Sequence, residues 1–334
     1  MSKYYALVTD YEASGQDLVR KLEALRAAFP DFEILVSVNG SEEYHKEVGE
    51  ACSSFGEELL PPPDISGLEA YANKIEIGYI GIIDLLREAS KRDLAGAVYI
   101  EADLWPIHKK VAERVKERLS SVDCVCYPRS YEARMSGFLG DPALIKAWRV
   151  WLGRTEAIQS PNFILGLSKK AIDAIIDEID NTPEGQAFMR TFKEVTRRHS
   201  TDASKYLSEL LFTTILKKRG FAFGPTWDDA HDPERNTITR HDQFYQRLGD
   251  PAVYFMHGFK KNAYPEQQSD YIYLLEFWGV VPSKEISIED VTLETEFPVQ
   301  FGVGEEDFCP VKAIFEKTGD EMGPKSNLME KPER

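Results

Sequence analysis

The chain has 334 residues, of which 43% are hydrophobic, so it is long enough for one large domain or two ordinary ones. Its formal net charge of −16 excludes a broad nucleic-acid surface, because binding to polyphosphate backbones needs clustered Lys and Arg. No stretch approaches the roughly 18 to 20 apolar residues that span a bilayer, and the N-terminus shows no secretory leader pattern. We therefore expect a cytoplasmic protein with no transmembrane segment.

The first part of the chain alternates between short apolar runs and segments of helical periodicity. The predicted strands are Tyr4–Val8, Phe32–Val38, Gly96–Ile100 and Asp123–Tyr127, and the predicted helices are Gln16–Phe29, Leu68–Ala89 and Ile107–Leu119. This alternation favours an α/β fold with a mostly parallel, doubly wound sheet and helices on both faces. In such sheets ligands bind beyond the carboxyl ends of the strands.

The later part of the chain has a mixed pattern. Helices are predicted near Pro142–Leu152, Lys169–Ile179 and Ser204–Lys218, separated by loops, and we interpret this part as elaboration on the substrate side. Periodicity is lost from Thr295 onward. The four cysteines are too few and too scattered for a disulfide framework, so we expect reduced, mostly buried thiols and no zinc site.

The sharpest chemical feature is a pair of carboxylates at the end of a predicted strand. Glu101 and Asp103 follow the apolar run Ala97–Ile100, and alternation along an extended chain places both on one side. Mg²⁺ and Mn²⁺ prefer oxygen ligands and usually hold substrate phosphates with one or two protein carboxylates. The alternative is that both acids only solvate the strand end or cap the next helix.

A second apolar run, Val253–Met256, ends in a histidine and, three residues later, a lysine. A neutral imidazole at His257 can complete a Mn²⁺ coordination sphere, and an ammonium at Lys260 can neutralise a phosphate oxygen. A structural hydrogen-bonding role is the alternative for His257.

Together these residues resemble the GT-A fold superfamily of metal-dependent glycosyltransferases, over roughly residues 4–262. There a strand-end Asp-x-Asp, or a variant with one carboxylate replaced, binds the metal and the nucleotide diphosphate. Here the motif reads Glu101-Ala102-Asp103. The resemblance implies a GT-A-like fold and a Mn²⁺ or Mg²⁺ ion held by Asp103, His257 and Glu101. Glu101 could instead touch the ribose or a metal-bound water.

The resemblance also implies a set of donor-binding positions. These nucleotide-sugar contacts are Thr9, Asp10 and Tyr11 in the first-strand loop, Asn39 at the second strand's end, Lys74 on the following helix, Glu101 and Asp103, and Lys260 at the leaving diphosphate. Each has a simpler alternative as a helix cap, a turn signal or a solvated helix charge.

Acceptor contacts are implied at Asn162, within a segment similar to the strand that lines the acceptor side, and at Trp105 and Trp227. The two indole rings fall in predicted loops near strand ends, where they could stack on a sugar; packing is the alternative.

The helix that includes Ser208–Lys218 resembles the catalytic helix of inverting members. Glu209 matches the general base that takes the proton from the acceptor hydroxyl, and Asp202 is a nearby substitute. Ser208 replaces the first of the family's two tandem acids, so Glu209 could instead only favour the helix's positive end. Because the segment from His257 to Lys260 resembles retaining members, the stereochemical outcome stays open, with inversion favoured.

The sequence thus predicts transfer of a sugar from a nucleoside-diphosphate sugar to a glycan or other hydroxyl-bearing acceptor. Residues 1–130 would bind the donor, residues 131–296 would form the acceptor-binding and catalytic half of the same domain, and residues 297–334 would be a partly mobile extension. One rival is a sugar-phosphate nucleotidyltransferase, although the first-strand loop is acidic where a triphosphate needs amides and cations. The other is a non-catalytic carbohydrate-binding relative.

Overall fold

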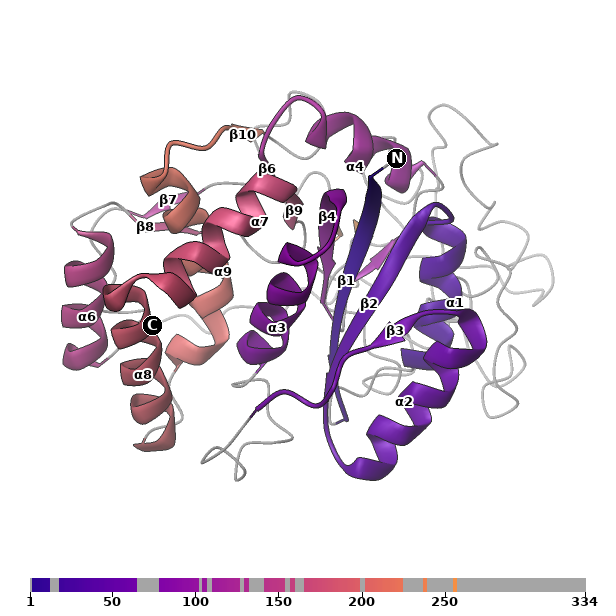
Figure 1. Ribbon diagram of the computed structural model, residues 1–334, viewed down its shortest axis with the longest axis horizontal. Coiled ribbons are helices and arrows are strands. Elements are labelled where there is room, and N and C mark those ends of the chain that lie inside the picture. The colour runs from indigo at the N-terminus through magenta and orange to yellow at the C-terminus, as the bar shows by residue number, and fades with distance from the viewer. Residues whose placement is uncertain are drawn as a thin grey trace, which may run out of the picture.

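The computed structural model describes residues 2–12, 18–64, 78–101, 104–106, 110–126, 129–131, 141–153, 157–159, 165–198, 202–224, 237–238 and 255–256. These residues build a seven-stranded sheet between two layers of helices (Figure 1). In spatial order its strands are β10 (Phe223–Gly224), β6 (Cys124–Val125), β9 (Leu165–Ser168), β4 (Leu94–Ile100), β1 (Lys3–Tyr11), β2 (Phe32–Asn39) and β3 (Glu58–Leu59). Only β9 runs against its neighbours β4 and β6. The predicted α/β class with a mostly parallel sheet is confirmed.

The first face of the sheet is covered by helices α1 (Leu18–Ala28), α2 (Glu42–Phe55) and α4 (Val111–Leu119). The central strands are apolar on both faces, as expected for buried parallel strands. Ala6 and Val8 of β1 pack towards these three helices, whereas Tyr5 and Leu7 pack towards the opposite layer. The alternation of side chains along β1 therefore divides the interior into two cores.

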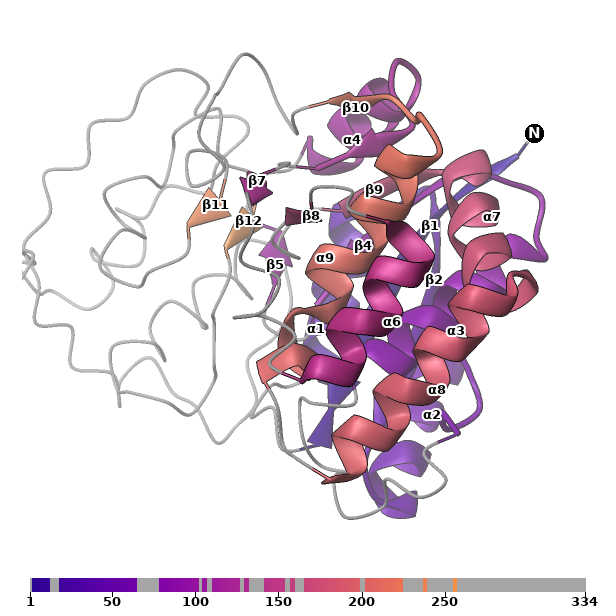
Figure 2. The same cartoon turned by 90° about the vertical axis from the view of Figure 1, so that its left-hand side faces the viewer.

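The second face carries a thicker layer of helices, seen from the front in Figure 2. It consists of α3 (Gly78–Ser90), α6 (Pro142–Leu152), α7 (Lys169–Ile176), α8 (Pro183–Arg198) and α9 (Asp202–Lys218). α9 is deeply embedded, since every residue from Leu210 to Leu216 is buried. The segment predicted as elaboration therefore supplies most of one layer of the fold.

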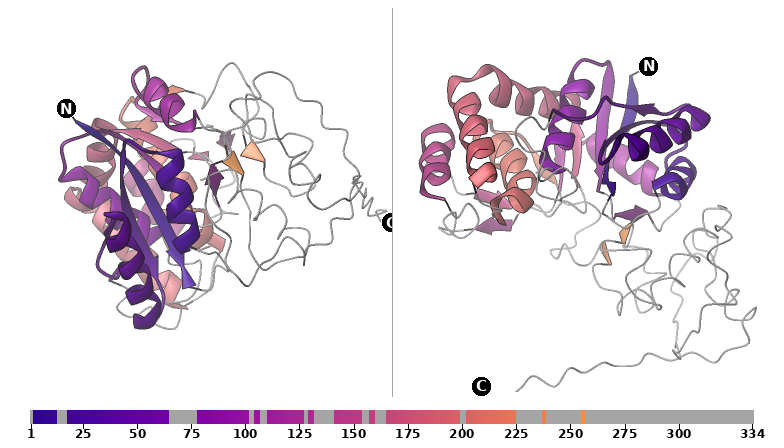
Figure 3. Two further views of the ribbon diagram at one scale, coloured as in Figure 1. Left: turned by 90° about the vertical axis from the view of Figure 1, so that its right-hand side faces the viewer. Right: turned by 90° about the horizontal axis from the view of Figure 1, so that it is seen from below.

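Two smaller sheets complete the described structure. One contains β5 (Trp105–Pro106), β12 (Phe255–Met256) and β11 (Thr237–Ile238), and the other pairs β7 (Arg129–Tyr131) with β8 (Ala157–Gln159). β5 and β12 pair although they lie 149 to 151 residues apart in the chain, and both lie beyond one edge of the main sheet (Figures 2 and 3). Among the described helices, none combines the length and apolar composition that crossing a bilayer requires.

Several elements differ from the sequence prediction. α2 and α8 were not predicted, and β9, which follows Asn162 in the segment similar to the acceptor-side strand, runs antiparallel inside the main sheet. The helix predicted at Leu68–Ala89 is described from Gly78 onward, and its first part lies outside the described residues. Cys52, Cys124 and Cys126 are buried free thiols as expected, whereas Cys309 lies outside the described residues.

A buried carboxylate ties three helices together where α7 continues into a π-helical turn, Asp177–Asn181. Glu178 is 5% exposed and accepts hydrogen bonds from the indole N–H of Trp151 at 2.9 Å and from Nε of Arg219 at 2.8 Å. The ammonium of Lys218 lies 3.3 Å from the same carboxylate. Burial acts to raise the pKa of Glu178, but these partners outweigh it and hold that pKa below its usual value.

Glu178→Gln should lower the free energy of unfolding at neutral pH by about 1.5–3 kcal/mol, the range for hydrogen bonds to charged groups. Because the folded-state pKa is depressed, the stabilisation is complete above the usual value of 4.5 and is lost as pH falls through the folded pKa. The difference between wild type and variant should therefore shrink in acid, as measured by urea unfolding across pH.

Asp177→Asn is the matched control, because the neighbouring carboxylate also pairs with Arg219 but is 50% exposed. Exposed ion pairs contribute less than about 1 kcal/mol. Equal losses in the two variants at every pH would contradict the special role of Glu178.

Candidate functional site

The order of the strands reverses at β1, and this places the candidate site at the carboxyl ends of the strands around it. From β1 the chain proceeds to β2 and β3 on one side, and then returns to β4 on the other side of β1. In open α/β sheets a crevice for ligands forms at the carboxyl ends of the strands where this reversal occurs. The relevant edge is therefore the carboxyl ends of β1, β2 and β4.

The register of the strands collects five of the predicted residues at this edge. Thr9 pairs with Ser37, Asp10 with Val38 and Tyr11 with Asn39 between β1 and β2. On the other side, Val8 pairs with Ile100, and Glu101 follows directly after β4. The structure thus brings together the predicted donor-binding residues Thr9, Asp10, Tyr11, Asn39 and Glu101.

On the α3 side of this edge, β1 and β4 are joined by a buried hydrogen bond. The hydroxyl groups of Thr9 and Tyr99 lie 2.7 Å apart. α3 approaches closely because residue 81 is Gly: a Cβ there would lie 2.9 Å from Oγ of Ser37 and 3.7 Å from Cγ2 of Thr9. The Ser37 hydroxyl is buried and has no hydrogen-bond partner in the described part of the chain.

On the opposite side, the carboxylate of Asp10 is hydrogen-bonded to other residues of the protein. It is 3% exposed, and its carboxylate accepts from the Tyr11 N–H at 2.7 Å and from the Tyr44 hydroxyl of α2 at 3.1 Å. Burial, and then the negative charge of Asp10, raise the pKa of Tyr44, so its hydroxyl stays protonated and continues to donate. Asp10 therefore fixes the shape of the first-strand loop.

A cap on α2 locks the same loop. Glu12 accepts from the N–H of Ser41 at 2.8 Å and from its hydroxyl at 3.1 Å, while that hydroxyl accepts from the N–H of Tyr44 at 3.2 Å. Only Gly allows this approach at residue 40, because a Cβ there would lie 2.7 Å from Tyr44 and 2.9 Å from Glu12. The loop after β1 and the start of α2 thus form one unit.

A lysine that is not among the predicted site residues reaches the end of β4. Lys21 of α1 is fully buried, and its ammonium donates a hydrogen bond to the backbone carbonyl of Glu101. The same carbonyl accepts from the N–H of Leu104 at 3.1 Å. The sequence does contain a sign of this burial. Leu18, Leu22 and Leu25 define the buried face of α1, and the helical spacing places Lys21 on that same face.

The chain that follows this turn pairs with a distant segment. Trp105 of β5 faces Met256 of β12, and Pro106 faces Phe255. β5 begins two residues after Asp103, and β12 ends one residue before His257. The described strands that lie next to two of the predicted metal ligands in the sequence therefore pair with each other, whereas Asp103 and His257 themselves lie outside the described residues.

Trp105 requires a correction to its predicted setting. It lies in a strand rather than a loop, and its side chain is fully buried in the core under α1 and α4. Its position is that of a packing residue, and a role in stacking on an acceptor gains no support from it.

The other predicted site residues are less fully described. Lys74, Asn162, Trp227 and Lys260 lie outside the described residues. Glu209 lies within α9, seven residues after the helix begins at Asp202, and its side chain is outside the described part. Asp202, rather than Glu209, therefore stands at the helix start.

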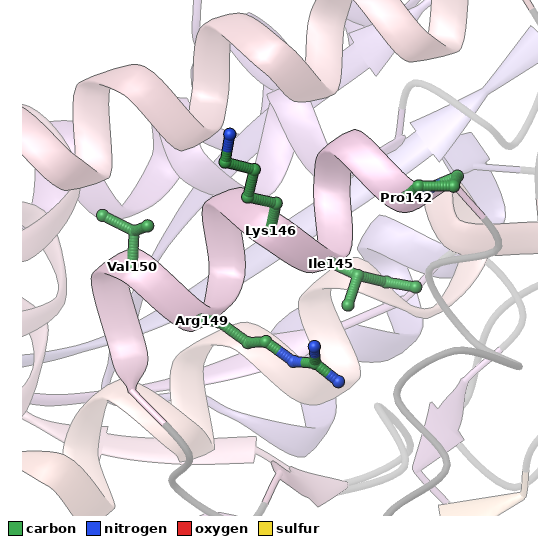
Figure 4. Close-up of a pocket in the computed structure, with 5 residues that line it drawn as sticks. All are labelled: Pro142, Ile145, Lys146, Arg149 and Val150. Carbon is green, nitrogen blue, oxygen red and sulfur yellow. The ribbon is translucent and has the colours of Figure 1, made fainter.

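The described residues alone do not define a complete metal site. Among them, no three His, Cys, Asp or Glu side chains form a group that could hold a metal ion. A hollow of about 450 Å³ lies on the outer face of α6, lined by Pro142, Ile145, Lys146, Arg149 and Val150 (Figure 4). It belongs to the outer helical layer, away from β1 and β2 (Figures 1 and 3).

No family model matches the chain, and no curated protein is similar to it in sequence. The solved structures that it resembles include the galactosyltransferase LgtC in complex with donor and acceptor sugar analogues, at 12% identity over 84% of this chain and 98% of that chain, with a TM-score of 0.41.

Two further solved structures are similar to the chain. A protein from Desulfovibrio desulfuricans G20 described as a nucleotide-diphospho-sugar transferase is 10% identical over 83% of this chain and 98% of its own, with a TM-score of 0.37. The 4-diphosphocytidyl-2C-methyl-D-erythritol synthase from Anaerococcus prevotii DSM 20548 is 9% identical over 57% of this chain and 82% of its own, with a TM-score of 0.34.

Proposed function

We propose that the chain is a metal-dependent glycosyltransferase that moves a sugar from a nucleoside-diphosphate sugar to an acceptor hydroxyl. The observation that carries the proposal is the reversal of strand order at β1, with polar side chains of β1, β2 and β4 in register at the carboxyl edge. That edge is where open α/β sheets bind ligands. The carboxylates after β4 add the oxygen donors that a hard cation needs.

The proposed cation ligands are Asp103, His257 and Glu101. The pairing of β5 with β12 supports this set, because these strands are flanked by Asp103 and His257. Two carboxylates and one imidazole suit Mn²⁺ well, and Mg²⁺ would rely more on the oxygen donors. When bound, the cation would supply stabilisation of negative charge on the departing diphosphate.

The donor nucleotide would lie along the ends of β1 and β2. Thr9, Tyr11 and Asn39 are proposed to contact it, with Asp10 holding the loop through its bond from Tyr44. Lys74 and Lys260 are proposed to neutralise phosphate oxygens, since an ammonium acts as a compact positive charge.

The acceptor would approach from the side of α9. Asn162 and Trp227 are proposed to orient it, and Glu209 to take the proton from its hydroxyl as that oxygen attacks the anomeric carbon. The new bond forms as the bond between the anomeric carbon and the diphosphate oxygen breaks, with inversion. Because the donor is held against one edge of the sheet, attack from the opposite face of the sugar is the simplest geometry.

Nucleoside diphosphates and their sugars should raise the melting temperature in the presence of Mn²⁺, with a stabilisation of about 2.7 kcal/mol at a ligand concentration of 100 Kd. A chelator, or Asp103→Asn, should remove most of the shift, because Asp103 would hold the cation whose positive charge favours binding of the diphosphate. Differential scanning fluorimetry across a panel of nucleotides measures this.

The same panel separates the rivals. Stabilisation by nucleoside triphosphates with a sugar phosphate, but not by diphosphate sugars, would favour a nucleotidyltransferase. Cation-independent binding of glycans alone, without transfer or donor hydrolysis, would favour a carbohydrate-binding protein.

Glu209→Gln should lower kcat by roughly 10²–10⁴-fold, the usual contribution of a general base, while the KM for the donor changes little. Gln has nearly the same shape but cannot take the acceptor's proton. Asp202→Asn is the matched comparison, because Asp202 begins the same helix. If transferase assays show a loss of kcat only in Asp202→Asn, the general base is Asp202 at the helix start. A product with retained configuration would exclude a single inverting displacement.

A further inference from the structure

Lys21 occupies a position that ordinary helix packing does not explain. It lies on α1 between Leu18 and Leu22, on the face that packs against the sheet, and it is fully buried. Among the described lysines, it is the one that is fully buried. Removing an ammonium from water costs several kcal/mol unless hydrogen bonds and opposite charge compensate it. A methionine or leucine would fill the same space at no such cost.

The ammonium of Lys21 is directed at the turn that follows β4. It donates to the carbonyl of Glu101, which also accepts from the N–H of Leu104 at 3.1 Å. A bond between residues three apart is the one that closes a tight turn. One carbonyl oxygen is thus held by two donors, one of them charged, and hydrogen bonds with a charged partner are the stronger kind.

The surroundings make this contact rigid. Leu104 and Trp105, which follow the turn, are both fully buried, and α1 also contacts β5. β5 in turn pairs with β12. The two residues that share this bond, Glu101 and Leu104, are therefore anchored to α1 and to the core.

We propose that Lys21 is a positioning residue: its buried ammonium fixes the Glu101 carbonyl, and thereby the turn from which the acidic pair binds its cation. The part concerning the cation rests on the proposed function. The hold on the turn does not, and it can be measured on the protein without any ligand.

The first test is amide hydrogen exchange at Leu104 in the full chain. Lys21→Met keeps the length and the packing but removes the donor, so exchange at this amide should become about tenfold faster or more, as expected for loss of a charge-assisted hydrogen bond. Lys21→Arg keeps a charged donor and should restore part of the protection. Lys21→Leu, which also lacks a donor, replaces Lys21→Met if the latter fails to fold, with the same expected direction.

Arg20→Met is the matched control. It removes one positive charge from the adjacent position of α1, where the guanidinium pairs with Glu23 at 3.2 Å on the helix surface. Leu104 exchange should stay at the wild-type rate in this variant. A wild-type rate in folded Lys21→Met as well would overturn the proposal.

The second test measures Mn²⁺ binding in the presence of a nucleoside diphosphate by titration calorimetry. Lys21→Met should bind Mn²⁺ about tenfold more weakly than wild type, with Lys21→Arg intermediate and Arg20→Met unchanged. Faster Leu104 exchange with unaltered Mn²⁺ affinity would overturn the link between the turn and the cation. If wild type itself bound no Mn²⁺, the proposed function and that link would both fall, and Leu104 exchange alone would decide whether Lys21 holds the turn.

Discussion

The burial of β1 between β2 and β4 is the constraint on which the candidate site depends. A strand with parallel neighbours on both sides and helices on both faces must be apolar throughout, and Ala6, Leu7 and Val8 are at most 1% exposed. Beyond Val8, β1 continues with the polar residues Thr9 and Asp10, which are still buried at 8% and 3% exposed. The apolar parts of β1 and β4 thus end at the same level, because Val8 pairs with Ile100 and the polar residues Thr9 and Glu101 follow them.

At the carboxyl ends of β1 and β4, hydrogen bonds within the chain hold the acidic residues in place. Asp10 is held by Tyr44 and Glu12 by Ser41, while the backbone at Glu101 is held by Lys21. Asp10 and Glu12 are thereby held in place by uncharged donors, and Lys21 adds a buried ammonium near the end of β4 in a chain with a net charge of −16. The edge is therefore shaped before any ligand arrives, which is the condition that precise binding of a diphosphate requires.

Much of the fold could be predicted from the sequence because its signals are local. The runs at Tyr4–Val8 and Phe32–Val38 became β1 and β2, and the periodic segment near Pro142–Leu152 became α6 with the same bounds. α2 was missed because Asn39-Gly40 suggested a loop, although Ser41 at its N-cap and Gly56 at its C-cap, with φ of 74°, are ordinary helix signals. The direction of β9 has no local signal, because it depends on pairing with β4 and β6.

The candidate site was predictable only in part, for the same reason. Strand-end residues such as Thr9 and Asn39 can be inferred once the strands are found, since parallel strands end at one edge. The contact from Lys21 to Glu101 spans 80 residues, and the pairing of Trp105 with Met256 spans more. Neither has a sequence pattern. The burial of Trp105 likewise depends on β5, which the sequence had assigned to a loop.

Paramagnetic broadening by Mn²⁺ tests the central claim most directly, because its effect on amide resonances falls steeply with distance from the ion. With a nucleoside diphosphate present, the amides of Glu101, Leu104 and Met256 should broaden first, and those of Ile145 and Val150 on α6 should stay sharp. Broadening centred instead on the acidic first turn of α2, at Glu42 and Glu43, or no selective broadening at all, would contradict a cation site at the end of β4.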